Sequence, residues 1–400
     1  MTASMRKLPN LKNATWLNEP RLQRVMAVLN AAGEVRVAGG AVRNALMRLP
    51  IADVDLATTL LPADVMQLAK QAGFNAHPTG IEHGTVTVVN HAVAFEVTTL
   101  RRDIETDGRH ATVVFTRHFA EDAARRDFTM NAMYCSSRGE ITDYTDGYND
   151  ILKNRIKFVG DAKQRIAEDY LRILRFFRFY AAYGKGAPDA SGLAACKKLK
   201  PGLQQLSAER VRQEMFKLLA APRAVDALKV MAAAGILKLI LPYTEDWRVL
   251  KRLPTDPVLR LFVLAKDVGS LKERLRLSNE EHARLGGLAA APALSPKLRE
   301  KERRAMLYAL GPNTWRDAVV MAWAKARVAL DDRAWGNLLK LGERWSIPQL
   351  PISGKDLLAQ GMQPGPQLGA ALQSAEDYWV AADFTPTAGE LLELIKGMDA

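Results

Sequence analysis

The stretch Val37-Ala-Gly-Gly-Ala-Val-Arg-Asn44, followed nine residues later by Asp53-Val-Asp55, decides the fold of this chain. A β-rich run leads into the two glycines and a helical pattern follows them, which predicts a strand, a tight turn and a helix. Glycines lack a Cβ atom, so their backbone N–H groups can approach a triphosphate closely. Arg43, one turn into the helix, can reach the same phosphates. We therefore expect Gly39, Gly40 and Arg43 to bind nucleotide.

The Asp53-Val-Asp55 sequence predicts a metal centre. The two acids flank Val54 on a predicted strand, so both carboxylates face one side of it and Val54 faces the core. Two adjacent carboxylates are unfavourable unless cations neutralise them, and Mg²⁺ accepts oxygen ligands of this kind. Two such ions can activate a 3′-hydroxyl and stabilise a leaving pyrophosphate. Asp53 and Asp55 are therefore candidate catalytic metal ligands.

Other nucleotide-binding motifs do not fit the sequence. It contains no GxGxxG, which excludes the Rossmann fingerprint, and Gly354-Lys355 is followed by Asp356, which excludes a P-loop. Taken singly, the glycine pair is also compatible with a plain turn and the aspartates with a loop edge. The two motifs at this spacing favour the catalytic interpretation.

The pattern of elements changes along the chain. Strand signals in the first 150 residues lie at Glu34–Ala38, Val54–Ala57, Thr85–Val89, Ala94–Leu100 and Thr112–Thr116, with helical patterns at Pro62–Ala72 and from Glu121. Beyond Ala162 the signals are helical, at Arg165–Tyr183, Ala208–Leu219 (capped by Ser207) and Ala224–Ala234, and later helices are joined by Pro/Gly loops. We expect an α+β fold: a head with a small mixed sheet (1–150), a helical neck (151–220), and a helical body and tail (221–400).

Composition and charge are compatible with a nucleic-acid-binding protein of the reducing cytoplasm. The net charge is +12, and residues 151–220 carry 15 Lys and Arg against 6 Asp and Glu. Such density suits a nucleic-acid backbone, although a solvated surface is the alternative. The two cysteines, Cys135 and Cys196, exclude a disulfide framework. Met1–Leu17 lacks an apolar signal region, and lysines interrupt the apolar runs, so neither secretion nor a membrane span is expected.

The segment Gly39–Thr58, GGAVRNALMRLPIADVDLAT, resembles the first signature of the bacterial class II tRNA nucleotidyltransferase and poly(A) polymerase family, within the polymerase-β superfamily. The resemblance implies a polymerase-β-type nucleotidyltransferase head followed by an all-α neck, body and tail. The family usually has Asp where Asn44 stands and Gly-Arg where Arg48-Leu49 stand. It also has a third metal carboxylate on a neighbouring strand, which the resemblance places at Glu96.

The segment Arg125–Ala132 resembles the family's second motif. On a helix, Asp127 and Asn131 would be neighbours able to share a ribose, and Arg126 would face phosphate. A solvated ion-pair face is the alternative for these charges. Asp143, Gly147 and Asp150 match the third motif, which we expect to form a rigid hinge between head and neck.

The segment Glu168-Asp-Tyr-Leu-Arg172 resembles the fourth motif, which the family uses as a protein template for the incoming base. Asp169 would accept a hydrogen bond from the exocyclic amine of C or A, and Arg172 would donate to the ring acceptors. U and G present a carbonyl where the amine should be. The resemblance also implies that Glu168 orients Arg172 and that Arg175 and Arg178 contact phosphates. The alternative is an ordinary amphipathic helix with ion pairs.

The fifth motif is matched by Ser207–Leu219, where we expect Glu209 and Glu214 to brace the neck. Four activities share this framework: CCA addition, CC addition, A addition and poly(A) synthesis. Gly80–Thr87 stands where poly(A) polymerases carry a GRRF-type stretch, and a flexible loop is expected at Arg102–Ala111. Both resemble CCA-adding members, which act on the 3′ end and acceptor arm of tRNA with CTP, ATP and two Mg²⁺ ions. A-only addition and a non-catalytic RNA-binding homologue remain alternatives.

Overall fold

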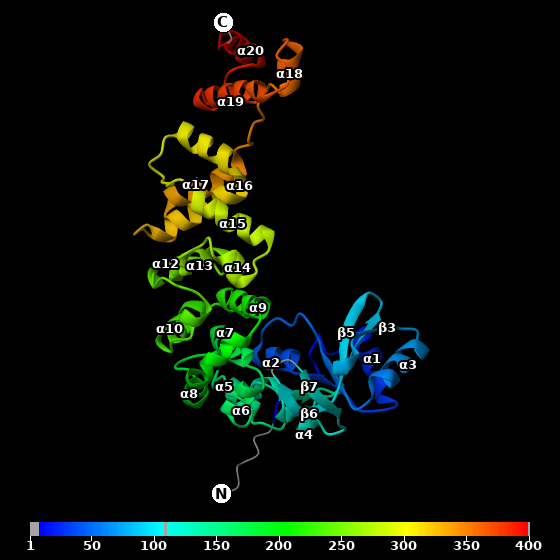
Figure 1. The fold of residues 1–400 in the computed structure, drawn as a ribbon. Coiled ribbons are helices and arrows are strands. Elements are labelled where there is room, and N and C mark those ends of the chain that lie inside the picture. The colour runs from blue at the N-terminus through cyan, green and yellow to red at the C-terminus, as the bar shows by residue number, and fades with distance from the viewer. Residues whose placement is uncertain (1–7, 108–109, 399–400) are drawn as a thin grey trace. The chain divides into compact units, whose positions relative to one another are not determined.

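The computed structural model describes residues 8–107 and 110–398, and the chain forms two compact units, Met1–Pro242 and Tyr243–Ala400 (Figure 1). Both boundaries expected from the sequence, near residues 150 and 220, fall inside the first unit. The division into head, neck and body therefore stays a prediction. Among the described helices, none has the length and apolar character needed to cross a membrane.

The first unit contains a mixed sheet of seven strands. Its order is β3 (Asn75–Gly80), β4 (Thr85–Asn90), β5 (Val93–Thr99), β2 (Leu56–Thr58), β1 (Val35–Ala38), β8 (Met133–Cys135) and β9 (Ile141–Asp143). Strands β2 and β5 are parallel, and the other neighbours are antiparallel. Helices α1 (Pro20–Asn30) and α3 (Pro62–Gln71) pack against this sheet. Together with the helices that follow, the sheet confirms the predicted α+β class.

Side-chain alternation along β5 separates its core face from its polar face. Phe95 and Val97 are buried, whereas Glu96 between them is exposed and Thr98 is half-buried. Because successive side chains of a strand point to opposite faces, Glu96 and Thr98 share the face away from this core. That alternation is what makes Glu96 available to a site.

The glycine turn forms as predicted. Strand β1 ends at Ala38, Gly39 adopts a positive φ of 59°, and α2 runs over Gly40–Met47. A Cβ atom on Gly39 would lie 3.0 Å from a guanidinium nitrogen of Arg126, so only glycine fits both the conformation and the space.

Helix α2 ends at Arg48, which has left-handed dihedrals of φ 57° and ψ 39°. The family usually has glycine at this position, and the conformation explains why. Helix α2 therefore ends at this position without a glycine. Asn44, where the family usually has Asp, donates from its amide to the backbone oxygen of Pro50 at 2.8 Å, a bond that a carboxylate would not make.

A two-stranded hairpin, β6 (Arg101–Asp107) with β7 (His110–Phe115), stands apart from the main sheet. The sequence predicted a flexible loop over Arg102–Ala111, and most of that segment is paired strand instead. The tip of that loop, residues 108 and 109, lies outside the described residues.

Helical segments complete the first unit. They are α4 (Phe119–Ala124), α5 (Gly147–Leu152), α6 (Ala162–Glu168), α7 (Leu171–Tyr183), α8 (Ala190–Leu199), α9 (Ala208–Leu219), α10 (Ala224–Ala233) and α11 (Leu237–Ile240), with 3₁₀ turns at Ile81–His83, Thr129–Asn131 and Lys200–Gln205. The prediction of one helix over Arg165–Tyr183 is wrong. The helix is interrupted at Asp169, whose φ of −157° is extended. Phe176 on α7 stacks on Phe158 at 5.6 Å between ring centroids, so the phenylalanines of the arginine-rich helix form core.

The second unit is helical in the part described. Its helices are α12 (Trp247–Arg252), α13 (Pro257–Leu264), α14 (Leu271–Leu275), α15 (Asn279–Ala290), α16 (Glu300–Lys325), α17 (Arg333–Arg344), α18 (Gly354–Ala359), α19 (Pro366–Ala381) and α20 (Ala388–Met398). One core forms around Trp315 and Trp335, and a second around Trp379 and Leu391.

Candidate active site

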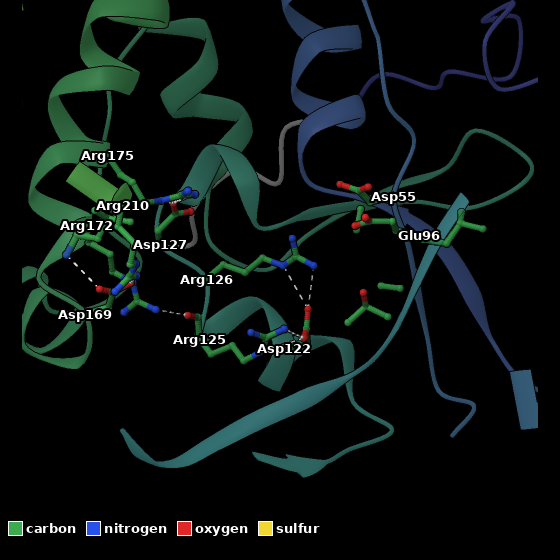
Figure 2. A pocket seen from close by; sticks show the side chains of 15 residues that line it. Asp55, Glu96, Asp122, Arg125, Arg126, Asp127, Asp169, Arg172, Arg175 and Arg210 are labelled. Atoms are coloured by element: carbon green, nitrogen blue, oxygen red, sulfur yellow. Dashed lines mark hydrogen bonds and ion pairs between the residues drawn. The ribbon is translucent and has the colours of Figure 1, made fainter. Parts of the chain in front are cut away.

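A polar cavity of about 420 Å³ lies in the first unit (Figure 2). It is lined by Ala38, Asp55, Leu56, Ala57, Glu96, Thr98, Asp122, Arg125, Arg126, Asp127, Asp169, Leu171, Arg172, Arg175 and Arg210. These residues come from the sheet, from the α4 segment and from helices α7 and α9, so the cavity joins parts of the chain expected to be head and neck. A volume of this size suits a nucleotide-sized ligand.

Asp55 and Glu96 lie at the sheet end of the cavity (Figure 2). Leu56 is the register partner of Val97 in the parallel pair of β2 and β5, and both are buried. Asp55 and Glu96 each precede one of these residues, so they emerge side by side on the opposite face. Burial, followed by the charges of Glu96 and Asp53, raises the pKa of Asp55. The cluster therefore disfavours negative charge until a cation is added.

Asp53 is exposed and does not line the cavity, and both aspartates come just before β2 rather than on it. In the part of the chain that the structure describes, no three His, Cys, Asp or Glu side chains are grouped closely enough to hold a metal. Mg²⁺, however, often binds one or two protein carboxylates and completes its shell with phosphate and water. The oxygen-only donors of Asp55 and Glu96 fit that requirement, and a role for Asp53 stays a prediction.

Two arginines and a buried acid form the middle of the cavity. Asp122 is 1% exposed and accepts hydrogen bonds from Arg125 at 2.7 Å, from Arg126 at 3.0 Å and from the Tyr134 hydroxyl at 2.6 Å. Burial on its own would raise the pKa of Asp122. The charges of Arg126 and Arg125 and the hydrogen bond from Tyr134 outweigh it and lower that pKa to about 2. Asp122 thus fixes Arg126 between the carboxylate end and the opposite wall (Figure 2).

Asp127 and Asn131 are neighbours as predicted, but not on a helix. Asp127 follows α4, and Asn131 ends a 3₁₀ turn, which still brings the Asn131 amide to 3.0 Å from the Asp127 carboxylate. Asp127 also accepts a hydrogen bond from Arg175 at 2.5 Å. Burial would raise the pKa of Asp127, but the charge of Arg175 and the hydrogen bond from Asn131 lower it. Asp127 and Arg175 line the cavity, and Asn131 stands behind them.

Arg43 is not among the residues that line the cavity. It is buried, donates to Asn131 at 2.5 Å and to the Tyr183 hydroxyl at 2.9 Å, and lies over the Tyr183 ring at 4.4 Å. Arg178 likewise pairs with buried Glu214 at 2.9 Å instead of lining the cavity. Phosphate contacts by these two arginines, and by the backbone of Gly39 and Gly40, stay predictions.

The helical end of the cavity holds Asp169 and Arg172. Arg172 pairs with Glu168 at 2.5 Å and donates to the backbone oxygens of Arg165 at 2.7 Å and Arg125 at 3.3 Å. Asp169 accepts from the Leu171 N–H at 3.1 Å and from Arg210 at 2.8 Å. Both side chains line the cavity, and these partners hold them in place.

The structure brings together seven of the predicted site residues as cavity lining: Asp55, Glu96, Arg126, Asp127, Asp169, Arg172 and Arg175. Gly39, Arg43, Asn131, Glu168 and Arg178 contact these or their neighbours, and Asp53 and Gly40 lie near them in sequence. Three charged lining residues were not predicted: Asp122, Arg125 and Arg210. Asp122 carried a signal, since it stands three and four residues before Arg125 and Arg126, whereas Arg210 carried none beyond its place in the fifth motif.

The predicted hinge is rigidly bonded. Asp143 accepts from the backbone N–H groups of Thr145, Gly147 and Tyr148 at 2.9 to 3.1 Å. A Cβ atom on Gly147 would lie 2.1 Å from the backbone oxygen of Thr129, so no larger residue fits there. Buried Asp150 accepts from the Thr129 hydroxyl at 2.7 Å.

The chain is similar to known proteins over most of its length. Residues 35–157 match the poly(A) polymerase head domain, and residues 189–248 match a segment described as a probable RNA- and SrmB-binding site of polymerase A. The chain is 35% identical over 386 residues to the mitochondrial CCA tRNA nucleotidyltransferase 1 of Mus musculus, covering 91% of this chain and 86% of that protein. The chain belongs to the class II tRNA nucleotidyltransferase and poly(A) polymerase family.

Further relatives within the family match over nearly the full length. The CCA-adding enzyme of Latilactobacillus sakei is 30% identical over 93% of this chain and 96% of its own. The crystal structure of the Bacillus stearothermophilus CCA-adding enzyme in complex with CTP superimposes with a TM-score of 0.78 at 27% identity, covering 95% of this chain and 97% of that one.

Proposed function

We propose that this protein adds or repairs the 3′-terminal CCA of tRNA, using CTP and ATP and no nucleic-acid template. The observation that carries the proposal is one cavity with two carboxylates, Asp55 and Glu96, at one end and an acid and an arginine, Asp169 and Arg172, at the other. Curated relatives that cover most of the chain are CCA-adding enzymes, which supports the same reaction.

The reaction is a phosphoryl transfer. The 3′-hydroxyl of the tRNA attacks the α-phosphorus of the nucleotide, a phosphodiester bond forms, the bond to pyrophosphate breaks, and the hydroxyl proton leaves to solvent. Asp55 and Glu96 would hold Mg²⁺, which when bound supplies positive charge for the attacking oxygen and the leaving group. Arg126, fixed by Asp122, would face the triphosphate between the two ends of the cavity.

Base choice would follow from the donors and acceptors that remain at the helical end. A guanidinium has five N–H donors, and Arg172 uses three on Glu168, Arg165 and Arg125 within the described residues. Two remain for ring acceptors of C or A. A carboxylate has about four lone-pair sites, and Asp169 uses two, so it can still accept from an exocyclic amine. U and G would set a carbonyl against this carboxylate.

Asn131 would bind the ribose, since its amide keeps one N–H donor and one acceptor site beyond its bonds to Asp127 and Arg43. Asp127 already accepts four hydrogen bonds, from Phe128, Asn131 and Arg175, so it would contact the ribose by exchanging one of them. Full CCA addition is favoured over poly(A) synthesis because Gly80–Thr87 lacks the GRRF-type stretch and because the relatives over most of the chain add CCA.

The test uses purified protein, Mg²⁺, labelled CTP or ATP, and tRNA lacking one, two or three terminal residues. We expect one A on tRNA ending in CC, and ordered addition of C, C and A on the shorter tRNAs. Arrest after CC would indicate a CC-adding enzyme, addition of A alone an A-adding enzyme, and a long A tail a poly(A) polymerase. No incorporation on any substrate would favour a non-catalytic RNA-binding homologue.

A further inference from the structure

We propose that Arg125 is a positioning residue that ties the root of the β6–β7 hairpin to the base-reading Arg172, and that it supports the terminal A addition more than C addition. The inference rests on the proposed function. It concerns a residue that lines the cavity but that the sequence motifs left without a role.

One side of Arg125 holds the hairpin root. Its Nε atom donates to the backbone oxygen of Arg101, the first residue of β6, at 3.0 Å. The backbone N–H of Arg101 lies 3.4 Å from the carboxylate of Asp122, which also binds Arg125. The two strands are joined at this root, because the Thr116 N–H donates to the oxygen of Leu100 at 2.9 Å. Arg125 and Asp122 therefore clamp the hairpin where it leaves the sheet.

The other side of Arg125 holds the base-reading arginine. Its backbone oxygen, at the C-terminal end of α4, accepts from Nη2 of Arg172 at 3.3 Å (Figure 2). Arg172 has further anchors in Glu168 and the Arg165 oxygen, both of which come from α6. Of the three partners of Arg172, two lie on α6, and Arg125 alone lies at the end of α4, next to the sheet and the hairpin.

The Asp122 anchor makes this connection stiff. Asp122 is almost fully buried, and the guanidinium of Arg125 binds it through both Nε and Nη2, at 2.9 and 2.7 Å. Both nitrogens bind the same carboxylate oxygen, Oδ1, and the Nε–H is shared with the Arg101 oxygen, so one buried acceptor anchors the guanidinium beside the hairpin root. A displacement of the hairpin root would therefore be passed to the backbone of Arg125 and on to Arg172.

Such a connection has a chemical use. C and A present their amine and ring acceptor at different distances from the sugar, so one Arg172 must take two positions during a complete CCA addition. A contact that links Arg172 to a separate hairpin gives the protein a way to move between them, and losing it should affect the two bases unequally.

The experiment compares Arg125→Ala and Arg125→Lys with a matched control, Arg117→Ala, which removes an exposed arginine of the same segment outside this cavity. Single-turnover rates at saturating nucleotide are measured for A addition to tRNA ending in CC and for C addition to tRNA lacking its last two residues. For Arg125→Ala we expect the ratio of A to C addition to fall about tenfold, the size of effect expected from one lost charge-assisted bond. Arg125→Lys should recover part of the ratio, since lysine keeps the charge and can donate to Arg101 but lacks the second guanidinium nitrogen that also binds Asp122.

A second measurement reports on the hairpin itself. Hydrogen exchange at Leu100–Arg102 should speed up in Arg125→Ala and stay unchanged in Arg117→Ala. Equal losses of C and A addition, or unchanged exchange at the root, would overturn the proposal. Because the same tRNAs are given to the unmodified protein, its failure to add CCA would count against the proposed function and not against the role of Arg125. If Arg125→Ala does not fold, the ratio measured for Arg125→Lys decides.

Discussion

Glu168 ends α6 and Arg172 lies in the first turn of α7, and their side chains form a 2.5 Å ion pair across the break between the helices. The break has a consequence for Asp169. At the break, Asp169 lines the cavity and pairs with Arg210, which lines it too. The proposed base-reading pair, Asp169 and Arg172, is thus held by one acid, Glu168, and one arginine, Arg210.

Asp169→Ala or Arg172→Ala should lower incorporation of C and A and admit U or G. Each change removes half of the edge that reads the base, so discrimination against U should fall by about tenfold to a hundredfold. Glu168→Gln should give a smaller loss, because the amide keeps one bond to Arg172 but not the charge. Misincorporation assays with all four nucleotides measure this, with the exposed Glu209→Gln as control. Unchanged selectivity in Arg172→Ala would refute the assignment of this pair.

Asp55→Asn and Glu96→Gln should each reduce incorporation of both C and A by about a hundredfold or more, while tRNA binding is kept. Metal-ion catalysis contributes several kcal/mol, and the amides are poor ligands for Mg²⁺. Asp53→Ala tests whether the carboxylate outside the cavity joins the site when metal binds. Single-turnover rates are compared with those of Asp64→Asn, which changes an exposed acid on α3. Near-normal turnover in Asp55→Asn would exclude the proposed metal centre.

Asp122→Asn should destabilise the protein in a pH-dependent way. The pKa of Asp122 is depressed in the folded state to about 2, so its contribution is complete above the ordinary carboxyl pKa and is lost as the pH falls through the folded value. That shift corresponds to about 2 kcal/mol at pH 7, falling to about half of this at pH 3. Urea unfolding of both proteins at the two pH values, followed by circular dichroism, gives the difference. A difference that stays constant with pH would contradict the buried ion-pair arrangement.

Local features of the site could be predicted from the sequence because each is set by a few adjacent residues. Gly39 is required by a positive φ at a turn, and the position of Glu96 between Phe95 and Val97 follows from the two-residue period of a strand. The strands β8 and β9 were missed because three residues give too short a pattern, and they exist through pairing with β1 and with each other.

The break at Asp169 could not be predicted, since neither Pro nor Gly marks it and apolar residues continue at helical spacing on both sides. A contact with a residue distant in sequence accompanies it. The ring of Tyr170 packs so closely on Gly202 that a Cβ atom there would lie 2.1 Å from it. The Asp169–Arg210 pair is non-local in the same way, because it depends on how α9 packs against α7. The sequence therefore predicted seven of the residues that line the cavity but not all of those that hold them.

Arg48→Gly should stabilise the protein by about 0.5 to 1 kcal/mol. Arg48 has a left-handed conformation, which costs a residue with a Cβ atom about 1 to 2 kcal/mol, partly offset by the greater freedom of glycine in the unfolded chain. Its side chain is exposed, so little packing is lost. Asn154→Gly is the control, since Asn154 also has a positive φ but asparagine tolerates it better. A rise of a few degrees in the melting midpoint is expected for Arg48→Gly and a smaller one for the control. Equal or negative shifts would show that the Arg48 side chain contributes stability.

Charge reversal at Lys197 and Lys198 should weaken tRNA binding. Both are exposed in the last turn of α8, inside the segment that matches the RNA-binding family model. Lys200 was grouped with them from sequence, but it donates to the backbone oxygen of Ala234 at 3.0 Å and is therefore left unchanged.

If both lysines contact phosphate, Lys197→Glu with Lys198→Glu should reduce the slope of log affinity against log salt by about two. The charge-matched control is Lys12→Glu with Lys70→Glu, which reverses two exposed lysines outside that segment and changes the net charge equally. Binding of full-length tRNA is measured at several salt concentrations, after melting curves have shown that both variants fold. A control that loses as much affinity would mean that overall charge, not this end of α8, attracts the tRNA. An unchanged slope in the α8 variant would place the tRNA on another surface.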